Sequence, residues 1–314
     1  MVRIGIDIGG TGIQLGVVDE KGNILQKGGI VTRTDIPFEE QVGQIVACVK
    51  GTLAAGDWTA EDLESVGVGV PGLADRNGNV IFCTNLGWKN VPFRETFVRL
   101  FGREVPVYID NDATVAGLAE SVAGVSAGTS SSVFITLGTG VGGGIVINGK
   151  VWSGAHGVGS EIGHMILELD GEPCTCGNKG CLERYCSATA IIRMAREQMI
   201  KHSDSLIMTM AGGDPANINA KIVFDAAREG DPTALKVFRR YVSCLGQAIA
   251  SIIQFMDPEV IVLGGGVSKA GDFLLDAVKA EVKKYVLYHH HPYSDIMIAR
   301  LGPDAGIIGA AMLS

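Results

Sequence analysis

The chain has 314 residues, long enough for two domains that each bury a core, and 46% of its residues are hydrophobic. A formal net charge of −8 argues against a nucleic-acid-binding surface, and no apolar run reaches the roughly eighteen residues of a membrane span. The start, MVRIGIDIGG, lacks the charged segment and long apolar stretch of a signal peptide, so we expect a cytoplasmic protein without nucleic-acid or membrane partners.

The first part of the chain predicts a mixed α/β arrangement. The β-branched run Arg3–Asp7 is typical of a strand, and Ile8–Gly12 after it is typical of a sharp turn. Strands at Gln14–Val18 and Ile24–Thr32 would continue this meander. The elements expected next are a helix at about Phe38–Leu53, a strand at Ser65–Val70, a hairpin turn at Asn77–Gly78, a helix near Phe93–Phe101, a strand at Val105–Ile109 and a helix over Ala113–Ala123.

The order of strand, glycine turn and strand recurs in the second part of the chain, at Ser131–Leu137, Gly138–Gly140 and Gly143–Ile147. The elements expected after it are helices at about Ala188–Lys201, Ala220–Glu229 and Pro232–Phe255, a strand at Glu259–Leu263, a helix near Asp272–Tyr285, a strand at Ile296–Ala299 and a helix at Ala305–Leu313. We therefore predict two related α/β halves facing each other across a cleft. The expected domains are a small one, residues 1–117 plus 302–314, and a large one, residues 118–301.

One histidine and three cysteines lie close together between Glu161 and Glu183. Three thiolates and an imidazole are the donor set of a closed tetrahedral zinc site, and nearby glycines allow the tight turns that bring ligands together. The predicted ligands are His164, Cys174, Cys176 and Cys181, with Cys186 as a weaker competitor for the last position. The alternative is that these are ordinary buried side chains. A closed site has no open position for water, so we expect a structural zinc.

The other cysteines, Cys48, Cys83, Cys186 and Cys244, are scattered singly, as expected for reduced core thiols in a cytoplasm. The run His289–His291 has no cysteine or carboxylate cluster around it, so we interpret it as a solvated loop rather than a metal site.

Three glycine turns follow three predicted strands, at Gly9-Gly10-Thr11, Gly138-Thr139-Gly140 and Gly264-Gly265-Gly266. Exposed backbone N–H groups in such turns bind anions, and a missing Cβ lets a phosphate approach closely. Each turn alone is equally compatible with a structural hairpin, but three together favour a nucleotide with several phosphates.

A dinucleotide fingerprint, G-x-G-x-x-G, is also present at Gly138, Gly140 and Gly143, with Glu161 eighteen residues later. That fingerprint must open a helix, whereas the residues GIVINGK that follow predict a strand, which disfavours a nicotinamide-dependent enzyme. The chain has no G-x-x-x-x-G-K-[ST] motif either, which argues against a P-loop kinase.

Carboxylates stand at the ends of two predicted strands. Asp110 and Asp112 flank Asn111 where a strand leads into a helix, so one of them is suited to take a proton from a substrate hydroxyl and the other to cap or orient. Asp7, beside the first glycine turn, could hold Mg²⁺ directly or through water, or could accept hydrogen bonds from the turn.

Taken together, the motifs IDIGGT at 6–11, DNDA at 110–113, LGTGVGGG at 137–144, EIGH at 161–164 and CTCGNKGCLE at 174–183 resemble the ROK family. That family groups bacterial sugar kinases with related repressors on the actin-like, ribonuclease-H-like ATPase fold. The resemblance implies ATP and Mg²⁺ in the interdomain cleft and a kinase acting on a hexose, with glucose as the leading substrate. Kinases for N-acetylmannosamine, mannose, allose and fructose share most of these motifs.

The resemblance also implies roles for individual residues. Asp112 would be the catalytic base that takes the proton from the 6-hydroxyl of the sugar, which then attacks the γ-phosphorus in line. The residues that would bind the sugar are Asn85, Asn111, Asp112, Glu161, His164 and Glu183. The residues that would bind ATP and its metal are Asp7, Gly9, Gly10, Thr11, Gly138, Thr139, Gly140, Gly265 and Gly266. Thr114 departs from the commonest pattern, which has asparagine there, and this affects the finer sugar contacts.

The family's repressors carry an N-terminal helix-turn-helix module, and here the first phosphate turn starts at Gly9, so a sugar-sensing regulator is the less favoured interpretation. A homodimer is implied by the resemblance alone. If one ring nitrogen of His164 binds zinc, the other carries a proton that can face the sugar, so the zinc would place groups that select the substrate.

Overall fold

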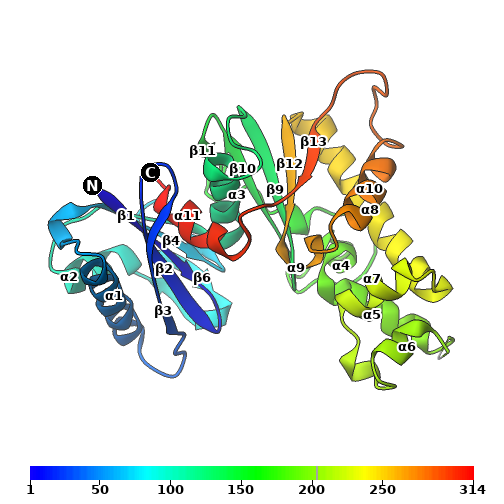
Figure 1. The fold of residues 1–314 in the computed structure, drawn as a ribbon, viewed down its shortest axis with the longest axis horizontal. Helices are drawn as coiled ribbons and strands as arrows, with labels where there is room; N and C mark the ends of the chain where they lie inside the picture. Colours follow the sequence, from blue (N-terminus) through cyan, green and yellow to red (C-terminus); the bar gives the residue numbers. More distant parts are fainter. Residues whose placement is uncertain (203) are drawn as a thin grey trace. The chain divides into compact units, whose positions relative to one another are not determined.

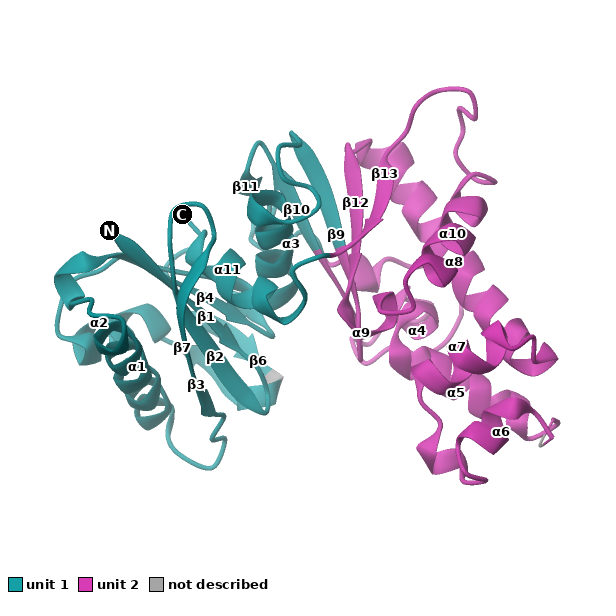
Figure 2. Cartoon of the chain, in the orientation of Figure 1, with its two compact units in different colours: residues 1–134, 144–160, 300–314 teal, residues 135–143, 161–299 magenta. Residues whose placement is uncertain are grey.

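The computed structural model describes residues 1–202 and 204–314 as a mixed α/β protein (Figure 1). Two compact units divide the chain (Figure 2). Unit 1 consists of Met1–Phe134, Gly144–Ser160 and Arg300–Ser314, and unit 2 of Ile135–Gly143 and Glu161–Ala299. These boundaries differ from those of the expected domains, residues 1–117 plus 302–314 and residues 118–301. The division into those two domains stays a prediction.

The main sheet of unit 1 has the strand order β3-β2-β1-β4-β8. Its strands are β1 (Val2–Ile8), β2 (Gly12–Val18), β3 (Ile24–Val31), β4 (Leu63–Val70) and β8 (Val107–Asn111). Strand β1 is antiparallel to β2 and parallel to β4, which is in turn parallel to β8. Because parallel strands end at the same edge of a sheet, Asp7, Gly69 and Asp110 share one row at that edge.

Helices cover both faces of this sheet. Helices α1 (Phe38–Ala55) and α2 (Phe93–Phe101) pack on Ile4 and Ile6, while α3 (Asp112–Ala123) and α11 (Ala305–Ala311) lie on the other face (Figure 1). The approach of α11 requires glycine, because a Cβ on Gly67 would lie 1.6 Å from the Ala310 carbonyl oxygen. A small sheet of β5 (Leu73–Ala74), β6 (Val80–Cys83) and β7 (Trp88–Val91) completes the first part of unit 1.

The second five-stranded sheet has the order β11-β10-β9-β12-β13. Its strands are β9 (Ser131–Leu137), β10 (Val141–Ile147), β11 (Lys150–Val151), β12 (Val260–Gly264) and β13 (Asp295–Ile298). The helices of unit 2 are α4 (Glu183–Cys186), α5 (Ala188–Met199), α6 (Leu206–Met210), α7 (Ala220–Arg228), α8 (Pro232–Met256), α9 (Gly265–Ser268) and α10 (Asp272–Val282). Within residues 1–202 and 204–314, no helix is both long and apolar enough to cross a membrane.

The expected elements are present, with three differences near the candidate site. Strand β8 runs to Asn111, so Asp110 and Asn111 belong to the strand rather than to a turn after it. Strand β10 begins at Val141, which leaves only Gly138–Gly140 in the turn and confirms that a strand follows the G-x-G-x-x-G pattern. The expected third glycine turn is wrong in form: Gly264 ends β12, and Gly265 and Gly266 begin the short helix α9.

Candidate functional site

The first glycine turn is closed by bonds within its own meander. The Gly9 N–H donates to the Gly12 carbonyl at 3.0 Å. Thr32, just after β3, donates its hydroxyl to the Gly9 carbonyl at 2.7 Å and its N–H to the Thr11 carbonyl at 3.3 Å. Gly10 and Thr11 remain exposed, so the predicted phosphate turn is accessible to a ligand.

Asn85 lies next to this turn. It is in the short 3₁₀ helix Thr84–Leu86, and its Cβ is 3.6 Å from the position that a Cβ on Gly10 would occupy. The Asn85 side chain is exposed. The structure therefore brings a predicted sugar-binding residue beside a predicted phosphate-binding residue within unit 1.

Asp7 and Asp112 form an electrostatically coupled pair at the carboxyl edge of the main sheet. Burial, and after it the charge of the nearby Asp112 carboxylate, raise the pKa of Asp7 to about 6. The Asp7 carboxylate also lies against α11, since a Cβ on Gly306 would be 2.2 Å from its Oδ2 atom. Two carboxylates of this kind are suited to a divalent cation, whose charge would relieve their mutual repulsion.

The helix α3 is capped by Asn111. Its side-chain oxygen accepts the N–H groups of Ala113 at 2.9 Å and Thr114 at 3.4 Å, so of the two roles expected for one aspartate, cap or orienter, the cap belongs to Asn111 instead. Asp110 instead accepts the Asn111 N–H at 2.7 Å and the Ser153 hydroxyl at 3.3 Å, and burial raises its pKa. Asp110 thus orients the cap, and Asp112 is left exposed at the first position of the helix.

Two further contacts define this region. The Asn111 amide nitrogen donates to the Gly72 carbonyl at 3.1 Å, which leaves its second hydrogen for another acceptor. Thr114, the residue that departs from the resembled pattern, is only 2% exposed. It packs closely against Gly144, because a Cβ added at Gly144 would lie 2.9 Å from the Thr114 Cα. The departure is therefore accommodated in the interior of unit 1.

The four predicted metal ligands converge in unit 2. One donor atom from each of His164, Cys174, Cys176 and Cys181 lies within 4.8 Å of all the others. The His164 Nδ1 atom is 3.7 Å from the Cys174 Sγ, and the Cys176 and Cys181 sulfurs are 3.6 Å apart. Zinc bond lengths at tetrahedral angles correspond to edges of about 3.8 Å between sulfurs and about 3.5 Å between sulfur and nitrogen.

The chemistry of this cluster also fits a cation. All of its cysteines are unpaired thiols, and burial together with the neighbouring sulfurs raises the pKa of Cys181 to about 12. A divalent metal compensates that cost by holding the thiolates. The competing candidate Cys186 is buried elsewhere, with its sulfur 3.9 Å from the Tyr241 carbonyl oxygen. The residues present therefore fit a closed zinc site.

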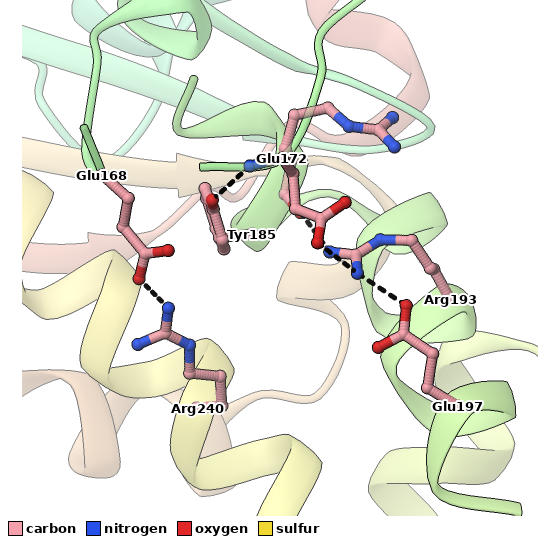
Figure 3. Close-up of polar contacts among 7 residues, drawn as sticks. Glu168, Glu172, Tyr185, Arg193, Glu197 and Arg240 are labelled. Atoms are coloured by element: carbon pink, nitrogen blue, oxygen red, sulfur yellow. Dashed lines mark hydrogen bonds and ion pairs between the residues drawn. The ribbon is translucent and has the colours of Figure 1, made fainter. Parts of the chain in front are cut away.

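The loop that carries the three cysteines, residues 165–182, is also held by ion pairs and a hydrogen bond away from the ligands themselves (Figure 3). Glu168 pairs with Arg240 of α8, and Glu172 pairs with Arg193 of α5 at 3.3 Å. The Glu172 N–H also donates to the hydroxyl of the buried Tyr185 at 2.8 Å. We call residues 165–182 the zinc loop; it is anchored to α5 and α8 through residues outside the ligand set.

Gly163 and Glu183, which lie on either side of the zinc loop, contact Val141 at the end of the second glycine turn. The Glu183 carboxylate accepts the Val141 N–H at 3.0 Å. It also lies against Gly140, because a Cβ added at Gly140 would be only 2.4 Å from the Glu183 Oε2 atom. On the other side, a Cβ on Gly163 would be 1.9 Å from the Val141 carbonyl oxygen. Gly163 belongs to the 3₁₀ helix Ile162–His164, which follows the exposed Glu161. The structure thus joins the EIGH motif, the second turn and Glu183 in one region.

The third glycine run borders the same region. Gly265 has a φ of +84°, and a Cβ there would lie 2.6 Å from the Leu137 carbonyl oxygen at the end of β9. Gly266 is exposed, with open space around its Cα. Gly265 and Gly266 therefore lie next to the second glycine turn, within unit 2.

The sequence model of the ROK family matches residues 3–314. The chain belongs to the ROK family. Among ROK relatives, it is 39% identical over 312 residues to a glucokinase of Thermotoga maritima, which covers 99% of this chain and 96% of the relative. This membership also excludes the nicotinamide-dependent interpretation of Gly138, Gly140 and Gly143.

Solved ROK structures share the fold. A ROK family glucokinase from Streptomyces griseus, in complex with glucose and AMPPNP, matches with a TM-score of 0.81 at 35% identity over 99% of this chain and 98% of its own. A ROK hexokinase from Thermus thermophilus matches with a TM-score of 0.83 at 30% identity, over 99% and 97%. The chain therefore has the actin-like ATPase fold of the ROK sugar kinases, as the motifs predicted.

The predicted ROK site residues fall into two groups. Those in unit 1 are Asp7, Gly9, Gly10, Thr11, Asn85, Asn111 and Asp112. Those in unit 2 are Gly138, Thr139, Gly140, Glu161, His164, Cys174, Cys176, Cys181, Glu183, Gly265 and Gly266. Sequence reasoning left open which aspartate would orient, and the structure gives that contact to Asp110; it missed Ala188 and Thr189, which contact the second turn. The serine N-cap at Ser187 predicts the helix start but not that contact.

Proposed function

We propose that this ROK protein is an ATP-dependent hexose kinase that converts glucose to glucose 6-phosphate. The observation that carries the proposal is the similarity, over 99% of the chain, to glucokinases at 35–39% identity, one of which is solved with glucose and AMPPNP. The exposed Asp112 beside the ionisable Asp7 supplies the carboxylates that phosphoryl transfer to a hydroxyl needs.

In unit 1 we assign the proton transfer to Asp112. It would accept the proton of the sugar 6-hydroxyl as that oxygen attacks the γ-phosphorus, while Asn85 and Asn111 bind neighbouring hydroxyls. Gly9, Gly10 and Thr11 would hold phosphate oxygens through backbone N–H groups. Asp7 would hold Mg²⁺, directly or through water, and the ion would neutralise charge on the phosphates.

In unit 2 we assign sugar recognition to Glu161, His164 and Glu183. Charged groups that bind hydroxyls discriminate between hexoses, because a misplaced hydroxyl leaves a buried partner unpaired. Gly138, Thr139 and Gly140 would bind ATP phosphates, and Gly265 and Gly266 would lie against the adenosine.

The zinc would be structural. The Nδ1 atom of His164 lies 3.7 Å from the Cys174 sulfur, so with Nδ1 on the metal, Nε2 would carry the proton and would donate to a sugar hydroxyl. His164, Cys174, Cys176 and Cys181 would fill the coordination sphere, so the metal would orient His164 and Glu183 rather than activate water. The expected homodimer and cytoplasmic location stay predictions.

A coupled ADP-release assay over a panel of hexoses and N-acetylhexosamines tests the proposal. We expect glucose to give the highest kcat/KM, with product phosphorylated at the 6-position by NMR. A higher kcat/KM for N-acetylmannosamine, mannose, allose or fructose would change the proposed substrate to that sugar and leave the proposed kinase activity in place. No phosphorylation of any sugar in the panel would contradict the proposal.

A further inference from the structure

The carbonyl groups of the second glycine turn are bound by the start of α5. The Gly138 carbonyl accepts the Ala188 N–H at 2.8 Å, and the Thr139 carbonyl accepts the Thr189 hydroxyl at 2.8 Å. Ser187 caps this helix by accepting the Ala190 N–H at 3.0 Å. Thr189 is exposed at the second position of α5, so its hydroxyl could bond to water, yet it bonds to the turn.

This arrangement fixes the direction of the opposite face of the turn. In a planar trans peptide, a carbonyl and the N–H of the next residue point in opposite directions. With the carbonyls of Gly138 and Thr139 facing α5, the N–H groups of Thr139 and Gly140 face away from it. Successive N–H groups that point the same way form a concave anion site.

The next N–H along the chain is already used, because Val141 donates to the Glu183 carboxylate. Of the groups that hold the turn, Ala188 acts through its backbone and Glu183 has a proposed role toward the sugar. Thr189 is the member whose side chain, within residues 1–202 and 204–314, donates its hydrogen bond to the turn and has no proposed role toward the sugar. Its effect on the turn can therefore be separated from sugar binding.

We propose that Thr189 is a positioning residue for ATP: its hydroxyl holds the Thr139 carbonyl and so aims the Gly140 N–H at a phosphate oxygen. This inference rests on the proposed function of the turn. A hydrogen bond of this kind contributes about 0.5–1.5 kcal/mol, which corresponds to roughly a 2–10-fold change in an equilibrium constant.

The test compares Thr189→Val, which keeps the shape and loses the hydroxyl, with Thr189→Ser, which keeps the hydroxyl. With ATP varied at saturating glucose, and glucose varied at saturating ATP, we expect Thr189→Val to raise the KM for ATP by roughly 2–10-fold. The KM for glucose and the zinc content should stay at wild-type values, and Thr189→Ser should restore the KM for ATP. The matched control is Thr233→Val, because Thr233 occupies the same second position in another helix, α8, whereas the described bonds to the turn come from Ala188 and Thr189.

An unchanged KM for ATP in Thr189→Val, an equal rise in both KM values, or a serine variant as impaired as valine would overturn the inference. A wild-type protein that phosphorylates no hexose would instead count against the proposed function. Calorimetric titration with ATP then decides the inference separately. Equal dissociation constants for wild type and Thr189→Val, or no ATP binding by wild type, would overturn it.

Discussion

The two glycine turns follow the same sequence plan and are supported in different ways. Gly9–Gly12 is held by Thr32, from the next strand of its own meander. Gly138–Gly140 is held by Glu183, Ala188 and Thr189, more than forty residues further along the chain, at the end of the zinc loop and the start of α5. The first support is local, and the second depends on a segment next to the proposed zinc ligands.

Because their supports differ, a change that disturbs one of the two turns need not disturb the other. Loss of zinc should disturb the turn in unit 2 and leave the turn in unit 1 intact, because none of the Thr32 bonds involves the zinc loop. The four predictions that follow test this contrast in order of decreasing effect.

The largest effect is expected from a residue outside both turns. Asp112→Asn should lower kcat by roughly two to four orders of magnitude, the range for losing a general base, with little change in the KM for ATP. The ADP-release assay measures it, and Asp276→Asn, an exposed change of the same kind on α10, serves as the control. Near-wild-type turnover would remove Asp112 from the role of base.

Removing a metal ligand should affect unit 2 selectively. Cys176→Ala should lower zinc affinity by at least about 100-fold and raise the KM for both glucose and ATP, because Glu183 and Gly163, on either side of the loop, contact Val141 next to the second turn. Elemental analysis and steady-state kinetics measure this, with Cys48→Ala as a control that keeps its zinc. Full zinc in Cys176→Ala would exclude Cys176 as a ligand, and an unchanged KM for ATP would refute the contrast between the turns.

The matching change in unit 1 should be smaller and independent of zinc. Thr32→Val removes the hydroxyl bond to Gly9, so we expect the KM for ATP to rise by roughly 2–10-fold. The rise should have the same factor in zinc-loaded and zinc-depleted protein, since independent sites contribute additively. Thr34→Val, an exposed neighbour, is the control. A rise that disappears on zinc removal would mean that the two turns are coupled.

The smallest effect is expected for the dependence of folding stability on pH. Asp7 precedes the first turn, where Thr136 stands before the second, and burial followed by the charge of Asp112 raises the pKa of Asp7 from 3.8 to about 6. The folded state therefore binds more protons than the unfolded state between these values, so this contribution to stability is present at low pH and is lost as pH rises through about 6. Without Mg²⁺, the thermal midpoint of wild type relative to Asp7→Asn should fall as pH increases from about 4 to 7. Parallel pH profiles of the two proteins would contradict this.

Local patterns predicted most of the fold. Runs of β-branched residues identified the strands, and the C-x-C-x4-C spacing brought three cysteines within ligand distance because their separation along the chain is short. The ends of some elements differ by a few residues from the prediction, because the residues there are compatible with either a strand or a turn. An example is the strand expected at Val105–Ile109, which is observed at Val107–Asn111.

The remaining site contacts could not be predicted, because they join distant segments. Asparagine and aspartate are equally good helix caps, so only the geometry assigns the cap to Asn111 and leaves Asp112 exposed. The sequence predicts that the missing Cβ of Gly140 leaves room for a phosphate. In the structure, the atom nearest to the position of that missing Cβ belongs to the Glu183 carboxylate. The bond from Thr189 to a backbone carbonyl has no sequence signature at all.

Val141 lies between Gly163 and Glu183, and this has a consequence for how such an enzyme can change. Any substitution at Glu183 that adapts the site to another sugar also withdraws the acceptor of the Val141 N–H. With the proposed roles of Glu183 and of the turn, sugar preference and nucleotide affinity would be linked traits in this chain. A redesign for a new hexose should begin with Glu161, whose side chain is exposed, and should leave Glu183 in place.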